Sequence, residues 1–137
     1  PQTTIVAYMP LDVPLPTDAE LAILRVLWTH GPATVREVQD RLTTDQGYTT
    51  VLKHLQIMLE KGLVTRDESG RAHVYAPDIA EEDTQRRLVR DLLDRAFEGS
   101  ARQLVMRALA TEQVTSDELD QIRDLLDQFD DSTDDDA

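Results

Sequence analysis

The chain has 137 residues, of which 40% are hydrophobic, so it can form one ordinary domain or two small ones. It contains no cysteine, which excludes disulfides, thiolate metal sites and cysteine nucleophiles and fits a cytoplasmic location. There is no apolar run of 18 residues, and the N-terminus lacks a basic flank with an apolar core, so we expect neither membrane insertion nor a signal peptide.

The net charge of −13 is unevenly distributed. Residues 17–77 carry seven basic and eight acidic groups, whereas residues 78–137 carry seven basic and eighteen acidic groups. An acidic chain repels phosphate at long range, so nonspecific nucleic-acid binding should be weak, although the near-neutral half could bind DNA if its few cations cluster. The asymmetry predicts two parts with different roles.

Residues 1–16 hold prolines at positions 10, 14 and 16, which disfavour a helix and predict an extended arm. One interpretation is a disordered tail. The other is an arm that packs on a partner subunit or on DNA.

Two short helices should follow, each opened by a capping box. Thr17 with Glu20 predicts a helix to about His30, ended by a glycine–proline pair. Its expected buried stripe consists of Leu21, Leu24, Leu27 and Trp28. Thr34 with Glu37 predicts a second helix over about 35–42, followed by a polar connector.

Tyr48–Lys61 reads as an amphipathic helix that Gly62 ends. The expected core side consists of Val51, Leu52, Leu55, Met58 and Leu59, and the outward side of Thr49, Thr50, Lys53, Ile57 and Glu60. Two threonines, a lysine and His54 near the start of an outward face are what a DNA-reading helix needs, but they also fit an ordinary solvated face.

A β-hairpin should follow directly, with strands at 63–66 and 71–76 around a turn at 67–70. Three helices and a hairpin predict a winged helix over 17–77, whose third helix would enter the major groove. Arg71, just after the hairpin tip, is the phosphate candidate. His73 either lies near the DNA backbone or packs against the body of the domain.

From residue 78 onward the sequence pattern predicts three amphipathic helices, one over 79–98 and two that begin after Ser100 and Thr115. So small a set cannot bury its apolar stripes alone, which favours a homodimerisation domain over 78–129. The dimer-forming candidates are Leu88, Leu92, Leu93, Phe97, Leu104, Leu109, Leu119, Ile122 and Leu126. The alternative is that these stripes pack on the winged helix of the same chain. Residues 130–137 are expected to form a disordered acidic tail.

The span from Pro16 to about Gln128 resembles the penicillinase-repressor (BlaI/MecI-type) family. The matching stretches are TDAELAILRVLW at 17–28, GPATVREV at 31–38, YTTVL at 48–52, LEKGLV at 59–64 and RAHVYAP at 71–77. The match is dense over the winged helix and looser over the C-terminal helices.

The resemblance implies a dimeric repressor of a palindromic promoter operator. In the family a membrane sensor detects a signal, and cleavage in the C-terminal helices destroys the dimer. The scissile asparagine–phenylalanine pair of the family would align near Arg107-Ala108, where neither residue is kept. Ile57 stands where we expect many members to have a basic residue; it is able to meet a thymine methyl but not a phosphate. The copper-responsive branch, which uses C-terminal cysteines, is excluded.

The sequence therefore predicts a mainly α fold with a small β-hairpin, acting as a homodimeric, sequence-specific repressor on double-stranded operator DNA. The DNA-contact candidates are Tyr48, Thr49, Thr50, Lys53, His54, Ile57, Arg71 and His73. A sensor protease is the other implied partner. The rival hypothesis is a winged-helix module that binds proteins and does not read DNA. We expect no enzyme, cofactor or metal site, because the phosphate-loop and paired-histidine motifs are missing.

Overall fold

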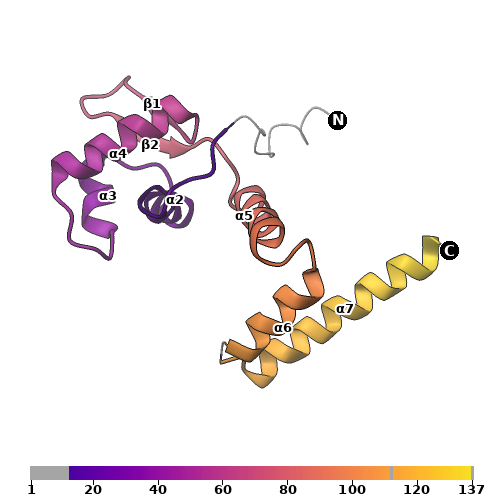
Figure 1. Cartoon of the computed structure of the whole chain (residues 1–137). Helices are drawn as coiled ribbons and strands as arrows, with labels where there is room; N and C mark the ends of the chain where they lie inside the picture. The colour runs from indigo at the N-terminus through magenta and orange to yellow at the C-terminus, as the bar shows by residue number, and fades with distance from the viewer. Residues whose placement is uncertain (1–12, 112, 137) are drawn as a thin grey trace. The chain divides into compact units, whose positions relative to one another are not determined.

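The computed structural model describes residues 13–111 and 113–136, whose helices and strands are drawn in Figure 1, and divides into two compact units between Asp91 and Leu92. The first unit holds three short helices, a hairpin and most of a fourth helix. The second holds the remaining helices. In chain order the elements are α2 (Asp18–His30), α3 (Val35–Arg41), α4 (Tyr48–Lys61), β1 (Val64–Asp67), β2 (Val74–Pro77), α5 (Glu81–Ala96), α6 (Ala101–Thr111) and α7 (Ser116–Asp136).

Both predicted capping boxes are confirmed. The Thr17 hydroxyl accepts a hydrogen bond from the Glu20 amide at 3.3 Å, and the Glu20 carboxylate accepts one from the Thr17 amide at 2.9 Å. Thr34 and Glu37 repeat this arrangement at 3.2 and 2.9 Å. Each box satisfies two amides that the first helical turn leaves unpaired, which is why α2 and α3 begin where they do.

The hydrophobic core lies in the first unit and is built by α2, α3, α4 and the hairpin. The expected stripe of α2 was partly wrong: Ile23 and Val26 are buried, while Leu21 and Trp28 are only half-buried. The reason is that α2 contacts α3, α4 and β2, so its apolar surface is wider than one stripe. Trp28 lies at the edge of the core, where its indole Nε1 donates to the Ile79 carbonyl at 3.0 Å.

Gly62 ends α4 as predicted, in a left-handed conformation with φ 85°. Its amide donates to the carbonyls at the end of the helix, and Leu63 then turns into the core. A side chain at this φ is strained, whereas Gly70, in the turn after β1, lies outside the left-handed region and leaves ordinary van der Waals space for a Cβ, with the Ala72 carbonyl oxygen 3.8 Å away.

We therefore expect Gly62→Ala to lower the free energy of unfolding by about 1 kcal/mol, because the Cβ of alanine is strained in the left-handed backbone conformation. Gly70→Ala is the matched control and should not lower the free energy of unfolding, because alanine is not strained at that position. Urea unfolding followed by circular dichroism measures both. Equal losses in the two variants would contradict a conformational role for Gly62.

The hairpin is antiparallel, with Val64 opposite Pro77 and Asp67 opposite Val74. The second strand was expected from residue 71, but pairing starts only at Val74, so residues 68–73 form the loop at the tip. The cause is local: the Asp67 carboxylate accepts from the Ser69 amide at 2.9 Å and turns the chain. Hydrogen bonds from Ser69 also lower the pKa of Asp67.

A third, one-residue strand joins the hairpin, because Ala33 and Tyr75 exchange both backbone hydrogen bonds at 2.8–2.9 Å. This bridge, which is flanked by Pro32 and the Thr34 cap, was not predicted from the sequence. It ties the α2–α3 connection to the hairpin and completes a winged helix.

The expected domain boundary after residue 77 is too early. Ile79 and Thr84 are buried, and an Arg87 guanidinium nitrogen donates to the Val13 carbonyl at 2.6 Å. The chain therefore packs with the winged helix as far as Asp91. Val13 and Leu15 also pack against this core, so the end of the predicted arm covers its own domain. Residues 1–12 lie outside the described residues.

The second unit contains no buried side chain among residues 92–111 and 113–131. Ser100 and Thr115 cap α6 and α7 as predicted, each accepting from an amide three residues later. The expected disordered tail is corrected for residues 130–136, which continue α7, because no glycine or proline interrupts 116–136. None of the described helices is both long enough and apolar enough to span a membrane.

Candidate nucleic-acid interface

The outward side of α4 is a ridge of four exposed residues, Thr49, Lys53, Gln56 and Glu60. Their spacing of four, three and four residues follows the helical repeat, so they lie on one face. The buried side consists of Val51, Leu55 and Met58, with Leu52 and Leu59 half-buried beside them. The helix therefore presents polar side chains outward while the opposite side anchors it.

The exposed ridge differs from the predicted outward side at one place, where Gln56 replaces Ile57. Ile57, expected to face outward, is half-buried at the flank, and Gln56, which the sequence analysis did not single out, is exposed. His54 is also half-buried, with an Nδ1 that is buried and has no hydrogen-bond partner among the described residues. Thr50 is exposed beside the ridge.

A groove of about 500 Å³ lies between the starts of α3 and α4 and the hairpin loop. It brings together three predicted residues, Tyr48, Arg71 and His73, with a fourth, Arg36, that was not predicted. The Arg36 guanidinium carbon lies 5.4 Å from the centroid of the Tyr48 ring, within cation–π range. The only signal in the sequence for Arg36 is its place between Thr34 and Glu37 of the capping box, where a first-turn side chain points outward.

The two arginines of this groove are available to an anion. Among the described residues neither Arg36 nor Arg71 forms a salt bridge, and both are exposed. Guanidinium groups bind phosphate oxygens with two parallel hydrogen bonds, so a pair of them beside a polar helix suits a nucleic-acid backbone.

The wing also carries an acidic group. The Glu68 carboxylate forms an ion pair with an Arg66 guanidinium nitrogen at 3.1 Å and lies 3.5 Å from His73 Nε2. The His73 side chain is 47% exposed, so it does not pack against the body of the domain. Glu68 thus neutralises Arg66 and leaves Arg71 as the free cation of the loop.

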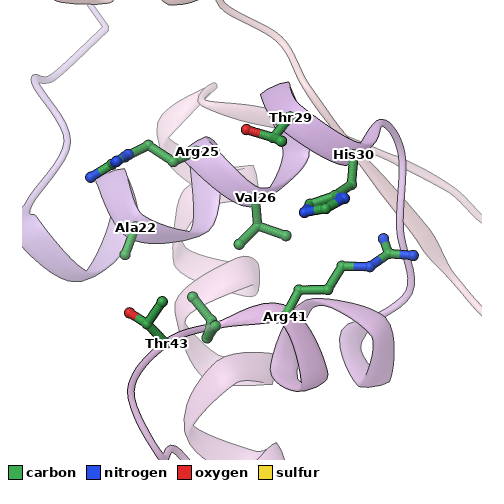
Figure 2. A pocket seen from close by; sticks show the side chains of 8 residues that line it. Ala22, Arg25, Val26, Thr29, His30, Arg41 and Thr43 are labelled. Atoms are coloured by element: carbon green, nitrogen blue, oxygen red, sulfur yellow. The ribbon is translucent and has the colours of Figure 1, made fainter.

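A second concavity of about 350 Å³ lies between α2 and the end of α3 (Figure 2). It is lined by Arg25, His30 and Arg41, which resembles an anion site in composition. In Figure 2, however, Arg25 extends away from Arg41, and Arg41 lies 4.0 Å from the Glu37 carboxylate. The cations do not converge, so this pocket does not form an anion site. Within 13–111 and 113–136, no group of three or more histidine, aspartate or glutamate side chains is placed to hold a metal ion.

Comparison with known proteins gives a consistent result. Residues 16–128 match the family model described as penicillinase repressor. The chain is 36% identical to the transcriptional regulator BlaI of Mycobacterium tuberculosis over 77% of this chain and 78% of the relative. It is 26% identical to the penicillinase repressor of Bacillus licheniformis over 85% and 92%. The solution structure of Bacillus licheniformis monomeric BlaI with the blaP half-operator is similar over 52% of this chain and 89% of that one, at 33% identity and TM-score 0.46.

Proposed function

Because the chain belongs to the penicillinase repressor family, we propose that it is a homodimeric transcriptional repressor that binds a palindromic operator in double-stranded DNA. The observation that carries the proposal is the joining of two surfaces: the polar ridge of α4 and the groove that holds Arg36 and Arg71. A helix that enters the major groove needs the first, and a clamp on the flanking phosphates needs the second.

In this arrangement the start of α4 meets the base edges. Thr49, Thr50 and Lys53 are exposed there and supply hydroxyl and ammonium donors. Arg36 and Arg71 hold phosphates on either side of Tyr48, and His73 adds a second wing contact. His54 and Ile57 are half-buried at the flanks of the helix, where His54 reaches sugar or phosphate and Ile57 makes only apolar contacts.

Dimerisation is supported by the second unit, whose apolar side chains have no internal core. Leu126 is 57% exposed and Phe129 64% exposed, and Met106 is 49% exposed on α6. Several large apolar side chains exposed in one small helical unit favour burial against a partner. A second copy is the partner that a palindromic operator requires, because two half-sites at fixed spacing multiply the discrimination of one short helix.

Relief by proteolysis fits the same arrangement, since a cut in the second unit would remove dimer contacts. Arg107 and Ala108, near the position where the family is cleaved, are both exposed on α6. They are not the asparagine–phenylalanine pair of the family, so a membrane sensor protease acting here would need a different specificity at this bond.

The test is selection of full-length protein on a randomised duplex library, followed by salt titration on the enriched sequence. We expect an inverted repeat, and an affinity that falls steeply with salt as phosphate-bound counterions are released. Failure to retain any duplex at low salt would favour the rival function, a winged-helix module that binds proteins.

Arg36→Ala should weaken binding by about 3- to 10-fold on every duplex sequence and reduce the salt slope by about 1, since one phosphate contact is lost. Arg25→Ala is the matched control, because Arg25 is also an exposed arginine but lies outside the groove. Fluorescence anisotropy at several salt concentrations measures both. An equal loss in Arg25→Ala would mean that the effect is one of net charge and not of the groove.

A further inference from the structure

We propose that Gln56 is a specificity-determining residue that reads an adenine in each half of the operator. The inference rests on the proposed function and adds to it a base identity. On the ridge of α4, Gln56 is exposed, whereas Ile57, which was expected to face outward, is half-buried.

Gln56 is free to meet a ligand. The residue is exposed, and among the described residues no hydrogen bond or ion pair engages it or Lys53. The other lysine of the chain, Lys61, also lies in α4 but is held by Glu20 at 2.8 Å. Of the two lysines of α4, the one on the ridge is thus unpaired among the described residues and the other is held in an ion pair.

The chemistry of the ridge distinguishes its members. A glutamine carboxamide matches the N6 donor and N7 acceptor of adenine with two hydrogen bonds, a pattern that no other base shows in the major groove. A threonine hydroxyl can both donate and accept a hydrogen bond, so it does not distinguish donor from acceptor groups on the bases. A lysine ammonium is a point charge that binds guanine or phosphate alike. Gln56 is therefore the ridge residue best suited to select one base.

Gln56 lies within the length of α4 that can follow successive base pairs. It lies seven residues after Thr49, about 10 Å along the helix axis, which spans about three base-pair steps. Glu60 follows one turn later and is exposed on the same ridge, where its carboxylate repels phosphate. The reading segment of α4 therefore runs from Thr49 to Gln56 and ends there.

Lys53 precedes Gln56 by three residues, a rise of about 4.5 Å, which is between one and two base-pair steps. The base pair met by Lys53 and the adenine met by Gln56 should accordingly lie one or two steps apart in each half-site. The separation of these two positions in the selected sequence therefore tests the proposal independently of the presence of the adenine.

The experiment uses the full-length chain and its Gln56→Ala and Ile57→Ala variants, each selected on the same randomised duplex library. We expect the wild type to enrich an inverted repeat with an adenine at one position of each half-site. Gln56→Ala should keep the rest of the motif and lose preference at that position, where the wild type discriminates by about 5- to 150-fold. Ile57→Ala, changed at the adjacent residue, should keep the adenine.

The outcomes distinguish the role of Gln56 from the proposed repressor function. If the wild type enriches a motif and Gln56→Ala enriches the same one, the role of Gln56 is overturned and the repressor function stands. If Ile57→Ala loses the same position, the reading belongs to Ile57 and the proposal is also overturned. If the wild type enriches no motif, the proposed function itself fails. Circular dichroism of each variant confirms that loss of a base preference is not loss of fold.

Discussion

Truncation of the chain after Asp91 should lower its affinity for the selected operator by at least about 100-fold, because two linked half-sites become two independent ones. The fragment should nevertheless fold. Every residue that is buried in the described part of the chain lies between Glu20 and Thr84, inside the first unit. What the truncation removes is the second unit, with its exposed leucines and Phe129.

The measurement compares operator binding by residues 1–91 and by the full chain, with sedimentation of both. The full chain should sediment as a dimer and the fragment as a monomer, and the salt slope of the fragment on one half-site should be about half that of the full chain. Leu126→Asp in the full chain provides a matched point variant with all residues present. If the fragment binds as tightly as the full chain, dimerisation does not contribute to operator affinity.

The elements of the first unit were predictable because each boundary has a local chemical cause. Thr17, Thr34 and Gly62 mark helix ends by hydrogen bonds and backbone conformation that involve neighbours three or four residues away. Interactions of this kind can be recognised in short stretches of sequence. The expected helices and the hairpin were therefore found to within a few residues.

The errors arose where the cause is distant in the sequence. Arg36 joins Tyr48 and Arg71 only because the fold brings the start of α3, the start of α4 and the hairpin loop around one groove, and no spacing rule connects these residues. Ile57 was assigned to the outward side, but it is half-buried against the body of the domain, and the exposed Gln56 completes the four-three-four spacing of the ridge. The domain boundary was set too early because Pro77 changes the local pattern, whereas Ile79 is held in the core by contacts with α2.

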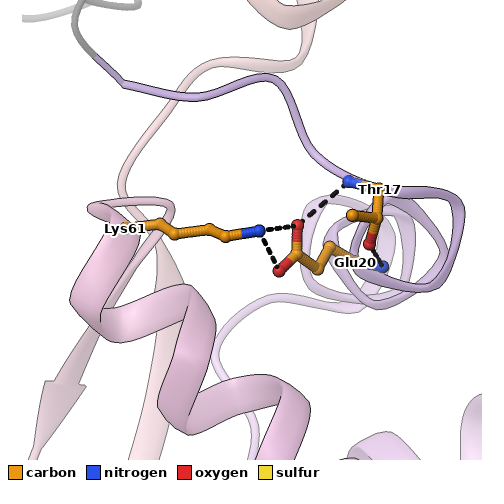
Figure 3. Close-up of polar contacts among 3 residues, drawn as sticks. All are labelled: Thr17, Glu20 and Lys61. Atoms are coloured by element: carbon orange, nitrogen blue, oxygen red, sulfur yellow. Dashed lines mark hydrogen bonds and ion pairs between the residues drawn. The ribbon is translucent and has the colours of Figure 1, made fainter.

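The orientation of α4 depends on a further long-range contact, the ion pair between Glu20 and Lys61 (Figure 3). The Lys61 ammonium lies 2.8 and 3.0 Å from the two carboxylate oxygens of Glu20, and one of these oxygens also accepts from the Thr17 amide. The Glu20 side chain is 3% exposed and that of Lys61 28%. The pair joins the start of α2 to the end of α4 and so fixes the angle at which the ridge is presented.

Lys61→Met should lower the free energy of unfolding by about 2 kcal/mol, less than for a fully buried pair because water still reaches Lys61. The cost arises from a buried carboxylate that keeps only the Thr17 amide. Combining Lys61→Met with Glu20→Gln should recover at least about half of it, because no charge is then buried and glutamine preserves the capping box. Arg123→Ala breaks the exposed pair with Asp120 as a control and should cost less than about 0.5 kcal/mol. Losses of equal size in Lys61→Met and Arg123→Ala would contradict this account.

The same pair predicts how the difference between wild type and Lys61→Met depends on pH. Burial raises the pKa of Glu20, but hydrogen bonds from Lys61 and Thr17 and the charge of Lys61 outweigh burial, so the pKa lies below its ordinary value of 4.5. A carboxyl group whose pKa is lower in the folded chain stabilises the fold above its unfolded pKa and ceases to do so once it is protonated. The stability difference between the two proteins should thus be constant from neutral pH to about 5 and shrink as the pH falls through the lowered pKa. A difference that stays the same on acidification would mean that Lys61 stabilises α4 through its aliphatic chain, whose packing does not titrate, and not through its charge.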